Sequence, residues 1–200
     1  MAKLSVVILT FNEEKNIARC IDCGRRVADE IVVVDSFSRD RTEEICRDKE
    51  ITFIQHEFEG HIEQKNWARK QASHPYVLSL DADEALSERL EKGILAEKEK
   101  GFPYDGYFFN RMTNFCGKWI RNCGWYPDKK LRLWDNEKGN WEGENPHDRF
   151  EMEKGATLKY LKGDLLHYSF YSIEEHMQTV NKFSSISANM RYRRGRKKDY

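Results

Sequence analysis

The sequence predicts an α/β fold with a mostly parallel central sheet, helices on both faces and a long C-terminal helix. In the first hundred residues, short and continuously apolar segments alternate with segments whose apolar residues recur at helical spacing. Continuous apolar runs between helices are typical of strands that are buried on both faces of a parallel sheet. Right-handed crossovers between such strands place helices on both sides of the sheet.

The predicted elements of the first half alternate along the chain. Strands are expected at residues 4–9, 31–34, 51–54 and 76–80. Helices are expected at residues 13–23, 40–46, 61–72 and 85–100. A longer helix is expected at 172–193, where apolar residues form one stripe that should pack against the sheet.

Length and charge limit the possible classes of protein. Two hundred residues suffice for one domain with a sizeable core. We expect a single domain over 1–200, with halves at 1–100 and 101–170 and a C-terminal helix with a basic tail at 171–200. The 34 basic residues balance the 34 acidic ones, so net charge indicates no nucleic-acid partner. Six of the last ten residues are basic, which fits either contact with anionic lipid or a solvated end.

The sequence shows no signal peptide before the first strand and no apolar stretch near the roughly 20 residues that span a bilayer. Five cysteines, an odd number, favour free thiols in a reducing compartment, so a cytoplasmic location is expected. A zinc site at Cys20, Cys23, Cys116 and Cys123 is conceivable, but the second pair is loosely spaced. Small core or surface residues are the simpler interpretation.

Two aspartates, Asp81 and Asp83, follow the fourth predicted strand directly. Carboxylates two residues apart after a strand can share one hard cation, because such ions prefer oxygen ligands. A bound Mg²⁺ or Mn²⁺ could then neutralise a substrate diphosphate. Such triplets also occur in turns and helix caps, and Asp83 is itself a candidate cap for the helix that follows.

Polar side chains also follow the first two strands. Thr10, Asn12 and Glu13 come after the first strand, and Asp35 and Ser36 come after the second. Ligands of parallel α/β sheets bind beyond the carboxyl ends of the strands. Asn12 and Asp35 are also good helix N-caps, so each alone has a structural alternative. Three strand ends that carry such groups at one edge nevertheless favour a binding site there.

The first turn excludes two common phosphate-binding folds. A dinucleotide fold needs a glycine-rich turn after the first strand, and residues 10–14 contain no glycine. The P-loop pattern is also absent from the sequence. A phosphate group would therefore be held by a metal ion and by side chains, which again points to Asp81 and Asp83.

Segments along nearly the whole chain match one known family. Residues 4–14, 31–36 and 78–84 resemble the family 2 glycosyltransferases, which have the Rossmann-like GT-A fold. Residues 63–68, 124–127, 130–133 and 146–148 are similar to the branch that includes the lipopolysaccharide-core β-1,4-glucosyltransferases. The resemblance implies that the first half binds a nucleotide-sugar, commonly a UDP-sugar, and that the second half binds an acceptor.

The resemblance also assigns roles to single residues. The positions that match the nucleotide-sugar pocket are Thr10, Asn12, Glu13, Asp35, Ser36, Lys65 and Asn66. Asp81 and Asp83 match the metal-binding triplet, with Asp83 as the direct ligand. His167 roughly matches a late histidine that completes the metal shell, although a lone histidine after an apolar run is more often a core residue.

The resemblance further implies an inverting reaction, in which one carboxylate takes the proton from the acceptor hydroxyl. Asp148 matches the position of this general base, where the family more often has glutamate. Glu142 and Glu144 in the same segment are its rivals, and a solvated loop is the structural alternative for all three.

Aromatic residues of the second half are candidates for sugar binding. Aromatic faces stack on the apolar faces of sugars, which makes Trp125, Tyr126 and Trp141 candidates. Large aromatics are more often core residues, but flanking glycines suggest exposed loops and favour the sugar role for Trp125 and Trp141. Arg132 could pair with a phosphate, and a structural ion pair is the alternative.

These features together predict a metal-dependent, inverting hexosyltransferase of bacterial surface polysaccharide or lipopolysaccharide biosynthesis. Its partners would be a nucleotide-sugar donor and a glycan or lipid-linked acceptor, with peripheral association at the inner face of the membrane. The alternative from another class is a nucleotide-sugar or glycan-binding module that has lost catalysis. An enzyme that makes the activated sugar would need a glycine-rich first loop, which the sequence lacks.

Overall fold

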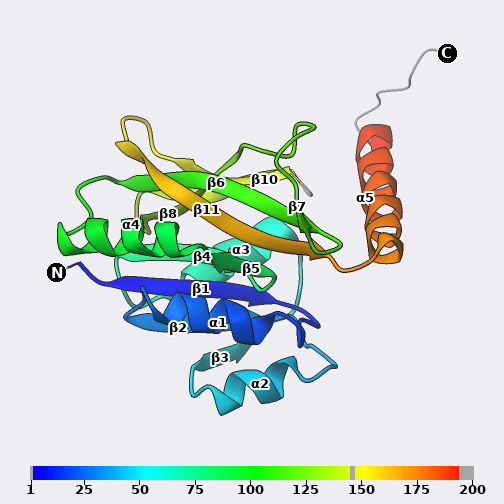
Figure 1. Ribbon diagram of the computed structural model, residues 1–200, viewed down its shortest axis with the longest axis horizontal. Helices are drawn as coiled ribbons and strands as arrows, with labels where there is room; N and C mark the ends of the chain where they lie inside the picture. Colours follow the sequence, from blue (N-terminus) through cyan, green and yellow to red (C-terminus); the bar gives the residue numbers. More distant parts are fainter. Residues whose placement is uncertain (1, 145–146, 194–200) are drawn as a thin grey trace.

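The computed structural model describes residues 2–144 and 147–193, and its centre is one nine-stranded sheet (Figure 1). The strands of this sheet are β1 (Leu4–Thr10), β2 (Glu30–Asp35), β3 (Thr52–Gln55), β4 (Tyr76–Asp81), β5 (Glu84–Leu86), β6 (Gly106–Phe115), β7 (Lys118–Trp119), β8 (Asp128–Asp135) and β11 (Leu158–Phe170). A separate hairpin consists of β9 (Gly139–Glu144) and β10 (His147–Met152). The helices are α1 (Ile17–Arg25), α2 (Thr42–Asp48), α3 (His61–Arg69), α4 (Glu88–Glu99) and α5 (Ile173–Arg193).

The strand order is β3-β2-β1-β4-β8-β6-β11-β5, with β7 paired to β6 outside this path. The four strands of the first half pair in parallel, as their continuous apolar runs predict. In the second half β8 runs antiparallel to β4 and β6, whereas β11 is parallel to β6. The predicted fold class is confirmed, and the parallel pairing of β1, β2, β3 and β4 lies in the first half of the chain.

Apolar side chains of the sheet are buried on both faces. On one face Val6 and Ile8 pack in a cluster that includes residues of α1 and α4. On the other face Val7 packs in a cluster with Trp134 and with residues of α3, β9 and β10. Successive side chains of a strand point to opposite faces, so β1 contributes to both clusters. The helix α3 and the hairpin β9–β10 are therefore fixed on the same side of the sheet.

The helix predicted at 85–100 begins later than expected. Residues Glu84–Leu86 form strand β5, which pairs antiparallel with β11, and α4 starts at Glu88. The side chain of Ser87 accepts a hydrogen bond from the Leu90 amide, so Ser87 is the N-cap and Asp83 is not. The pairing with β11, distant in sequence, overrides the local helical pattern.

Asn12 and Asp35 do not cap helices either. The N-cap positions of α1 and α2 are Asn16 and Arg41. Asn12 instead has a positive φ of 54° in the loop after β1. Asn12 therefore lies in the loop beyond β1, and Asp35 is the buried last residue of β2.

Helix α5 does not pack along the sheet, which contradicts the prediction. It stands to one side of the sheet in Figure 1, and Ile173, Met177 and Val180 are 67%, 51% and 44% exposed. Its first turns contact the rest of the chain through the His176 ring, whose centroid lies 4.6 Å from that of Phe170, and through the ion pair of Glu175 with Lys15. No helix among the described residues is long and apolar enough to cross a membrane.

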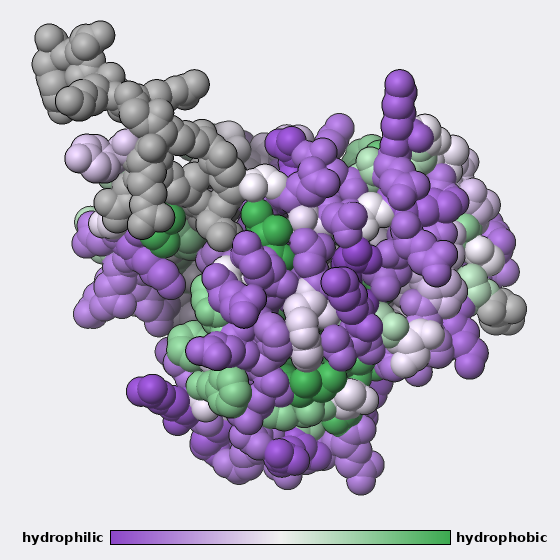
Figure 2. All heavy atoms as spheres, turned by 180° about the vertical axis from the view of Figure 1, so that it is seen from behind, coloured by the Kyte–Doolittle hydropathy of each residue, from purple (hydrophilic) through white to green (hydrophobic). Residues whose placement is uncertain are grey.

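The apolar stripe of α5 contrasts with the face of the molecule seen from behind, which is mostly hydrophilic and shows apolar residues only in small areas (Figure 2).

The cysteines give no support to a zinc site. Cys20 and Cys23 are buried in the core, and Cys116 and Cys123 are exposed. Their interpretation as core and surface residues is confirmed.

Candidate functional site

The carboxyl ends of β1, β2 and β4 lie side by side at one edge of the sheet. Thr10 pairs in register with Asp35, and Leu9 pairs with Asp81. The polar residues that follow these strands are thus brought together, as the sequence predicts.

The two loops beyond β1 and β2 hold each other in place. The Asn12 amide donates to Ser38 Oγ over 2.7 Å, and Asn12 Oδ1 accepts from the Arg39 amide over 2.8 Å. Asp35 is fully buried and accepts from the Ser38 amide over 2.8 Å. Asp35 therefore orders the loop whose Arg39 amide binds Asn12.

Two polar side chains at and just after the end of β1 are buried or partly buried. Thr10 Oγ1 is buried without a hydrogen-bond partner among the described residues. Burial raises the pKa of Glu13 to about 7. A hydrogen bond from Asn16 opposes this increase, and the charge of Asp83 adds a smaller increase. A carboxyl group that titrates near neutral pH beside the aspartate triplet will respond to any charge bound there.

A buried ion triad lies at the end of β4. The Arg132 side chain donates through Nη2 to Asp81 Oδ2 over 2.8 Å and to Glu84 Oε1 over 3.0 Å. Glu84 is fully buried, and its Oε2 accepts from the Asp81 amide over 2.9 Å. Arg132 Nη1 is buried and lacks a partner among the described residues. Arg132 therefore makes the structural ion pair and keeps one donor free for a ligand.

The pKa values of Asp81 and Glu84 are shifted in opposite directions. Burial alone would raise the pKa of Asp81, but Lys65 and Arg132 hold that pKa far below its usual range. Burial raises the pKa of Glu84, which Arg132 only partly offsets and the charge of Asp81 reinforces. Asp81 thus stays ionised at the sheet edge.

Asp83 and His167 form a second pair, with 3.1 Å between Asp83 Oδ2 and His167 Nε2. Register places them together, because His167 of β11 pairs with Glu84 of β5. Burial lowers the pKa of His167, but the Asp83 carboxylate outweighs this effect and raises it overall. A carboxylate oxygen and an imidazole nitrogen can both serve as ligands of Mn²⁺.

Within residues 2–144 and 147–193, no three His, Cys, Asp or Glu side chains lie close enough together to hold a metal ion. The donor pair of Asp83 and His167 fits an ion only if a substrate supplies further oxygen ligands. This is the usual arrangement for Mg²⁺, which binds one or two carboxylates together with substrate phosphates.

Lys65 of α3 connects the hairpin β9–β10 to the sheet edge. Its Nζ lies 2.5 Å from Asp148 Oδ2 and 3.9 Å from Asp81 Oδ1. The same ammonium lies 4.3 Å from the centroid of the Trp141 ring. The predicted general base and the predicted metal-binding triplet therefore face one shared cation.

The aromatic residue Trp141 is placed differently from the prediction. It is 5% exposed and packs edge to face against Trp134, with ring centroids 5.6 Å apart, so it does not lie on an exposed loop. The side chain of Asn66 is bonded to the Trp141 backbone on both sides, over 2.8 and 3.0 Å. Asn66 thus fixes the hairpin to α3, and its side-chain amide is engaged with the Trp141 backbone rather than directed to the carboxyl ends of the strands. Apolar packing against Trp134 outweighs the loop signal of the flanking glycines.

The other second-half candidates make no hydrogen bond or ion pair, among the described residues, with the ion triad or with Lys65. Glu142 is exposed on β9, and the side chain of Glu144 lies outside the described residues. Trp125 is 36% exposed. Tyr126 is held in place, since its Oη donates to Asp164 Oδ1 over 2.9 Å and accepts from Asn110 over 3.0 Å.

Sequence reasoning missed two residues that support the site. Glu84 was not considered, although it directly follows the aspartate triplet. Gln64 is buried on α3, where its Nε2 donates to Ser36 Oγ over 3.1 Å and its Oε1 lies 2.7 Å from His56 Nδ1. The sequence signal for such residues is a polar side chain at a position that the apolar pattern predicts to be buried. Buried polar groups are almost always hydrogen-bonded, so a polar residue at such a position indicates a bonding partner.

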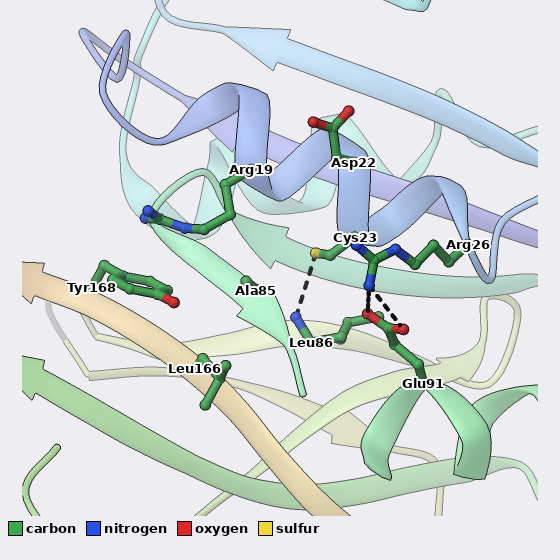
Figure 3. Close-up of a pocket in the computed structure, with 9 residues that line it drawn as sticks. All are labelled: Arg19, Asp22, Cys23, Arg26, Ala85, Leu86, Glu91, Leu166 and Tyr168. Carbon is green, nitrogen blue, oxygen red and sulfur yellow. Dashed lines mark hydrogen bonds and ion pairs between the residues drawn. The ribbon is translucent and has the colours of Figure 1, made fainter. Parts of the chain in front are cut away.

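A shallow pocket between α1, α4, β5 and β11 is separate from this site (Figure 3). It is lined by Ala85 and Leu166, which pair in register one residue away from Glu84 and His167. None of the residues that line this pocket is among those of the ion triad or the Asp83–His167 pair. Its rim carries the ion pair between Arg26 and Glu91, with an N–O distance of 3.0 Å.

Comparison with known proteins identifies relatives over most of the chain. Residues 5–161 match the model of glycosyl transferase family 2. A glycosyltransferase of Rickettsia bellii is 36% identical over 98% of this chain and 69% of its own length. A lipopolysaccharide core biosynthesis glycosyltransferase of Rhizobium meliloti is 27% identical over 97% of this chain and 73% of its own length.

Two solved structures share the fold. S. aureus TarS in complex with UDP superposes with a TM-score of 0.56 at 17% identity, over 88% of this chain and 62% of TarS. A mannosyltransferase from Pyrobaculum calidifontis in complex with GDP-Man and Mn²⁺ superposes with a TM-score of 0.58 at 17% identity, over 84% of this chain and 57% of the mannosyltransferase. The chain thus spans less than two thirds of either structure, and the likeness is one of fold.

The substitution Arg132→Met is expected to lower the free energy of unfolding by about 3–5 kcal/mol, because it leaves the acids of a buried ion triad unpaired. The control Arg149→Met removes an exposed partner of Glu151 and should cost about 1 kcal/mol or less. Since the pKa of Asp81 is lowered, its stabilising contribution should be complete above the ordinary pKa of 3.8 and be lost as the pH falls. Urea denaturation measures these values, and equal losses in the two variants would contradict the structural role of Arg132.

Proposed function

The chain belongs to glycosyltransferase family 2, and on that premise we propose that it moves a hexose from a nucleotide-sugar, with inversion, to a glycan or lipid-linked acceptor. The observation that carries this proposal is the position of Lys65, 2.5 Å from Asp148 and 3.9 Å from Asp81. It brings a candidate general base next to the edge of the sheet where a diphosphate would bind.

The donor is proposed to be a UDP-sugar, held beyond β1, β2 and β4. TarS was solved with UDP, and the archaeal mannosyltransferase with GDP-Man, which supports a nucleoside diphosphate as the donor class. Thr10 Oγ1 offers a hydrogen-bonding group without a partner among the described residues. Asp35 and Ser36 are held beside it at the end of β2, by hydrogen bonds with the Ser38 amide and with Gln64. The free Nη1 of Arg132 supplies a cationic donor for the phosphates.

Asp83 and His167 are proposed to hold Mg²⁺ or Mn²⁺ together with oxygens of the donor. Their 3.1 Å separation brings two suitable donor atoms to one place. When bound, the ion supplies positive charge that stabilises the departing diphosphate. The Asp81 carboxylate is hydrogen-bonded to Arg132, and this bond fixes the position of the aspartate triplet.

Asp148 is proposed to act as the general base. It would accept the proton of the acceptor hydroxyl while the acceptor oxygen forms a bond to C1 of the donor sugar. The bond from C1 to the diphosphate oxygen breaks, and its electron pair leaves with the nucleotide. Arg132 and Lys65 offset the negative charge that develops on this leaving group.

A bacterial surface glycan is the proposed acceptor class, supported by the similarity to the Rhizobium lipopolysaccharide core enzyme. We also propose peripheral attachment to the cytoplasmic face of the inner membrane. The exposed stripe of Ile173, Met177 and Val180 on α5 supports this attachment. The basic run at residues 191–198 adds charge of the sign that anionic lipid attracts.

The catalytic proposal is tested by incubating the protein with UDP- and GDP-hexoses and measuring hydrolysis or transfer, with the anomeric product identified by NMR. Turnover with an inverted product is expected. Asp148→Asn should lower it by about 10²–10⁴-fold, because general-base help is lost. The control Glu151→Gln, an acid on the same strand, should change it little. Retained turnover in Asp148→Asn with loss in Glu142→Gln would move the role to Glu142, and no turnover with any donor would favour a binding module.

The metal proposal predicts that Asp83→Asn and His167→Ala each weaken Mn²⁺ binding in the presence of UDP by at least about tenfold. The control Asp22→Asn removes an exposed acid that pairs with Lys49 and should leave binding unchanged. Electron paramagnetic resonance of free Mn²⁺ gives the affinities without requiring turnover. Wild-type affinity in both site variants would refute these ligands.

Membrane attachment predicts co-flotation with vesicles that contain phosphatidylglycerol and less with pure phosphatidylcholine. Met177→Glu and Val180→Glu should each reduce binding by about tenfold or more, because they remove apolar burial from the inserted stripe. Gln178→Glu adds the same charge to the adjacent polar face and is the matched control. Equal binding by all three variants would exclude α5 as the attachment element.

A further inference from the structure

We propose that Lys65 is a shared counter-ion that holds Asp148 in the free protein and moves to the diphosphate when the donor binds. Asp148 then becomes available as a base only in the donor complex. This inference rests on the proposed function, since it concerns the order of events at that same site.

The contacts of Lys65 show that it faces two alternative acidic partners. Its Nζ is 2.5 Å from Asp148 and 3.9 Å from Asp81, so it makes a close contact on one side and a looser one on the other. The Lys65 and Asp148 side chains are only 10% and 13% exposed. The Trp141 ring, 4.3 Å from Nζ, covers the ammonium and restricts access of water. A close pair in such surroundings is screened little by solvent.

This pair conflicts with the role of Asp148 as a base. The Asp148 oxygen that accepts the hydrogen bond from Lys65 is unavailable to an acceptor hydroxyl. In the free protein, therefore, the base is occupied by the very cation that lies nearest to the donor site.

The arrival of the donor changes this balance. A nucleoside diphosphate brings at least two negative charges to the sheet edge beside Asp81, against the single charge of Asp148. Arg132 is fixed there by bonds to Asp81 and Glu84, whereas Lys65 has a flexible stem and a compact charge that can swing between partners. Lys65 is thus the mobile cation of the site.

The shared cation links donor binding to the state of Asp148. Because donor binding must break the pair, the negative charge of Asp148 opposes it. Removal of that charge should free Lys65 in advance and tighten nucleotide binding, and by linkage this gain should depend on Lys65. A purely structural ion pair would give no such gain.

The test is isothermal titration of UDP, and separately GDP, with Mn²⁺ present, into the wild-type protein, Asp148→Asn, Lys65→Met and the double variant. Asp148→Asn is expected to bind the nucleotide about tenfold more tightly than the wild type. Lys65→Met should bind more weakly, and Asp148→Asn should have no further effect in its background. Glu151→Gln removes a charge from the same strand without touching Lys65 and should leave affinity unchanged.

Three outcomes would overturn the inference: unchanged affinity in Asp148→Asn, equal tightening in Glu151→Gln, or tightening that persists without Lys65. If Lys65→Met does not fold, the comparison of Asp148→Asn with Glu151→Gln decides alone, since both retain Lys65. Failure of every protein to bind either nucleotide would overturn the proposed function itself, and the inference with it.

Discussion

The bonds from Arg132 to Asp81 and Glu84 are the interaction on which the rest of the site depends. They tie β8, which carries the arginine, to β4 and β5, which carry the acids, so the two halves of the sheet meet at a charged centre. A buried triad of this kind contributes little net stability, because desolvation offsets most of the attraction. Its effect is to fix geometry: Glu84 binds the Asp81 amide and the arginine, and so sets the backbone from which Asp83 extends.

The fold explains why the chemistry gathers at this edge. Parallel pairing of β1, β2 and β4 aligns their carboxyl ends, which places Thr10 beside Asp35 and Leu9 beside Asp81. The second half adds the groups that act on these positions. Strand β11 delivers His167 to Asp83, and the hairpin β9–β10, clamped to α3 by Asn66, delivers Asp148 to Lys65. Side chains from the nine-stranded sheet, from α3 and from the separate hairpin are thus brought to one edge.

The sequence predicted those parts of the structure that follow from local pattern. The apolar runs of β1, β2 and β4 gave the parallel sheet, and sheet topology then gave the shared edge of Thr10, Asp35 and Asp81. The sequence prediction was wrong where contacts with residues distant in the sequence determine the local structure. Pairing with β11 turned Glu84–Leu86 into a strand, and packing against Trp134 buried Trp141. The free stripe of α5 was likewise beyond local pattern, because amphipathicity shows that a helix has an apolar face but not what covers it.

The site contains two kinds of cation, and the difference between them bears on how it works. Arg132 has its guanidinium locked between two acids, so it can offer a ligand only the direction in which Nη1 already points. Lys65 is held by one acid and covered by one aromatic ring, and its stem allows it to follow the charge. A fixed arginine suits a place where a phosphate must always bind in one position. A mobile lysine suits a place where the same charge is needed by two groups in turn, as we propose for Asp148 and the diphosphate of the donor.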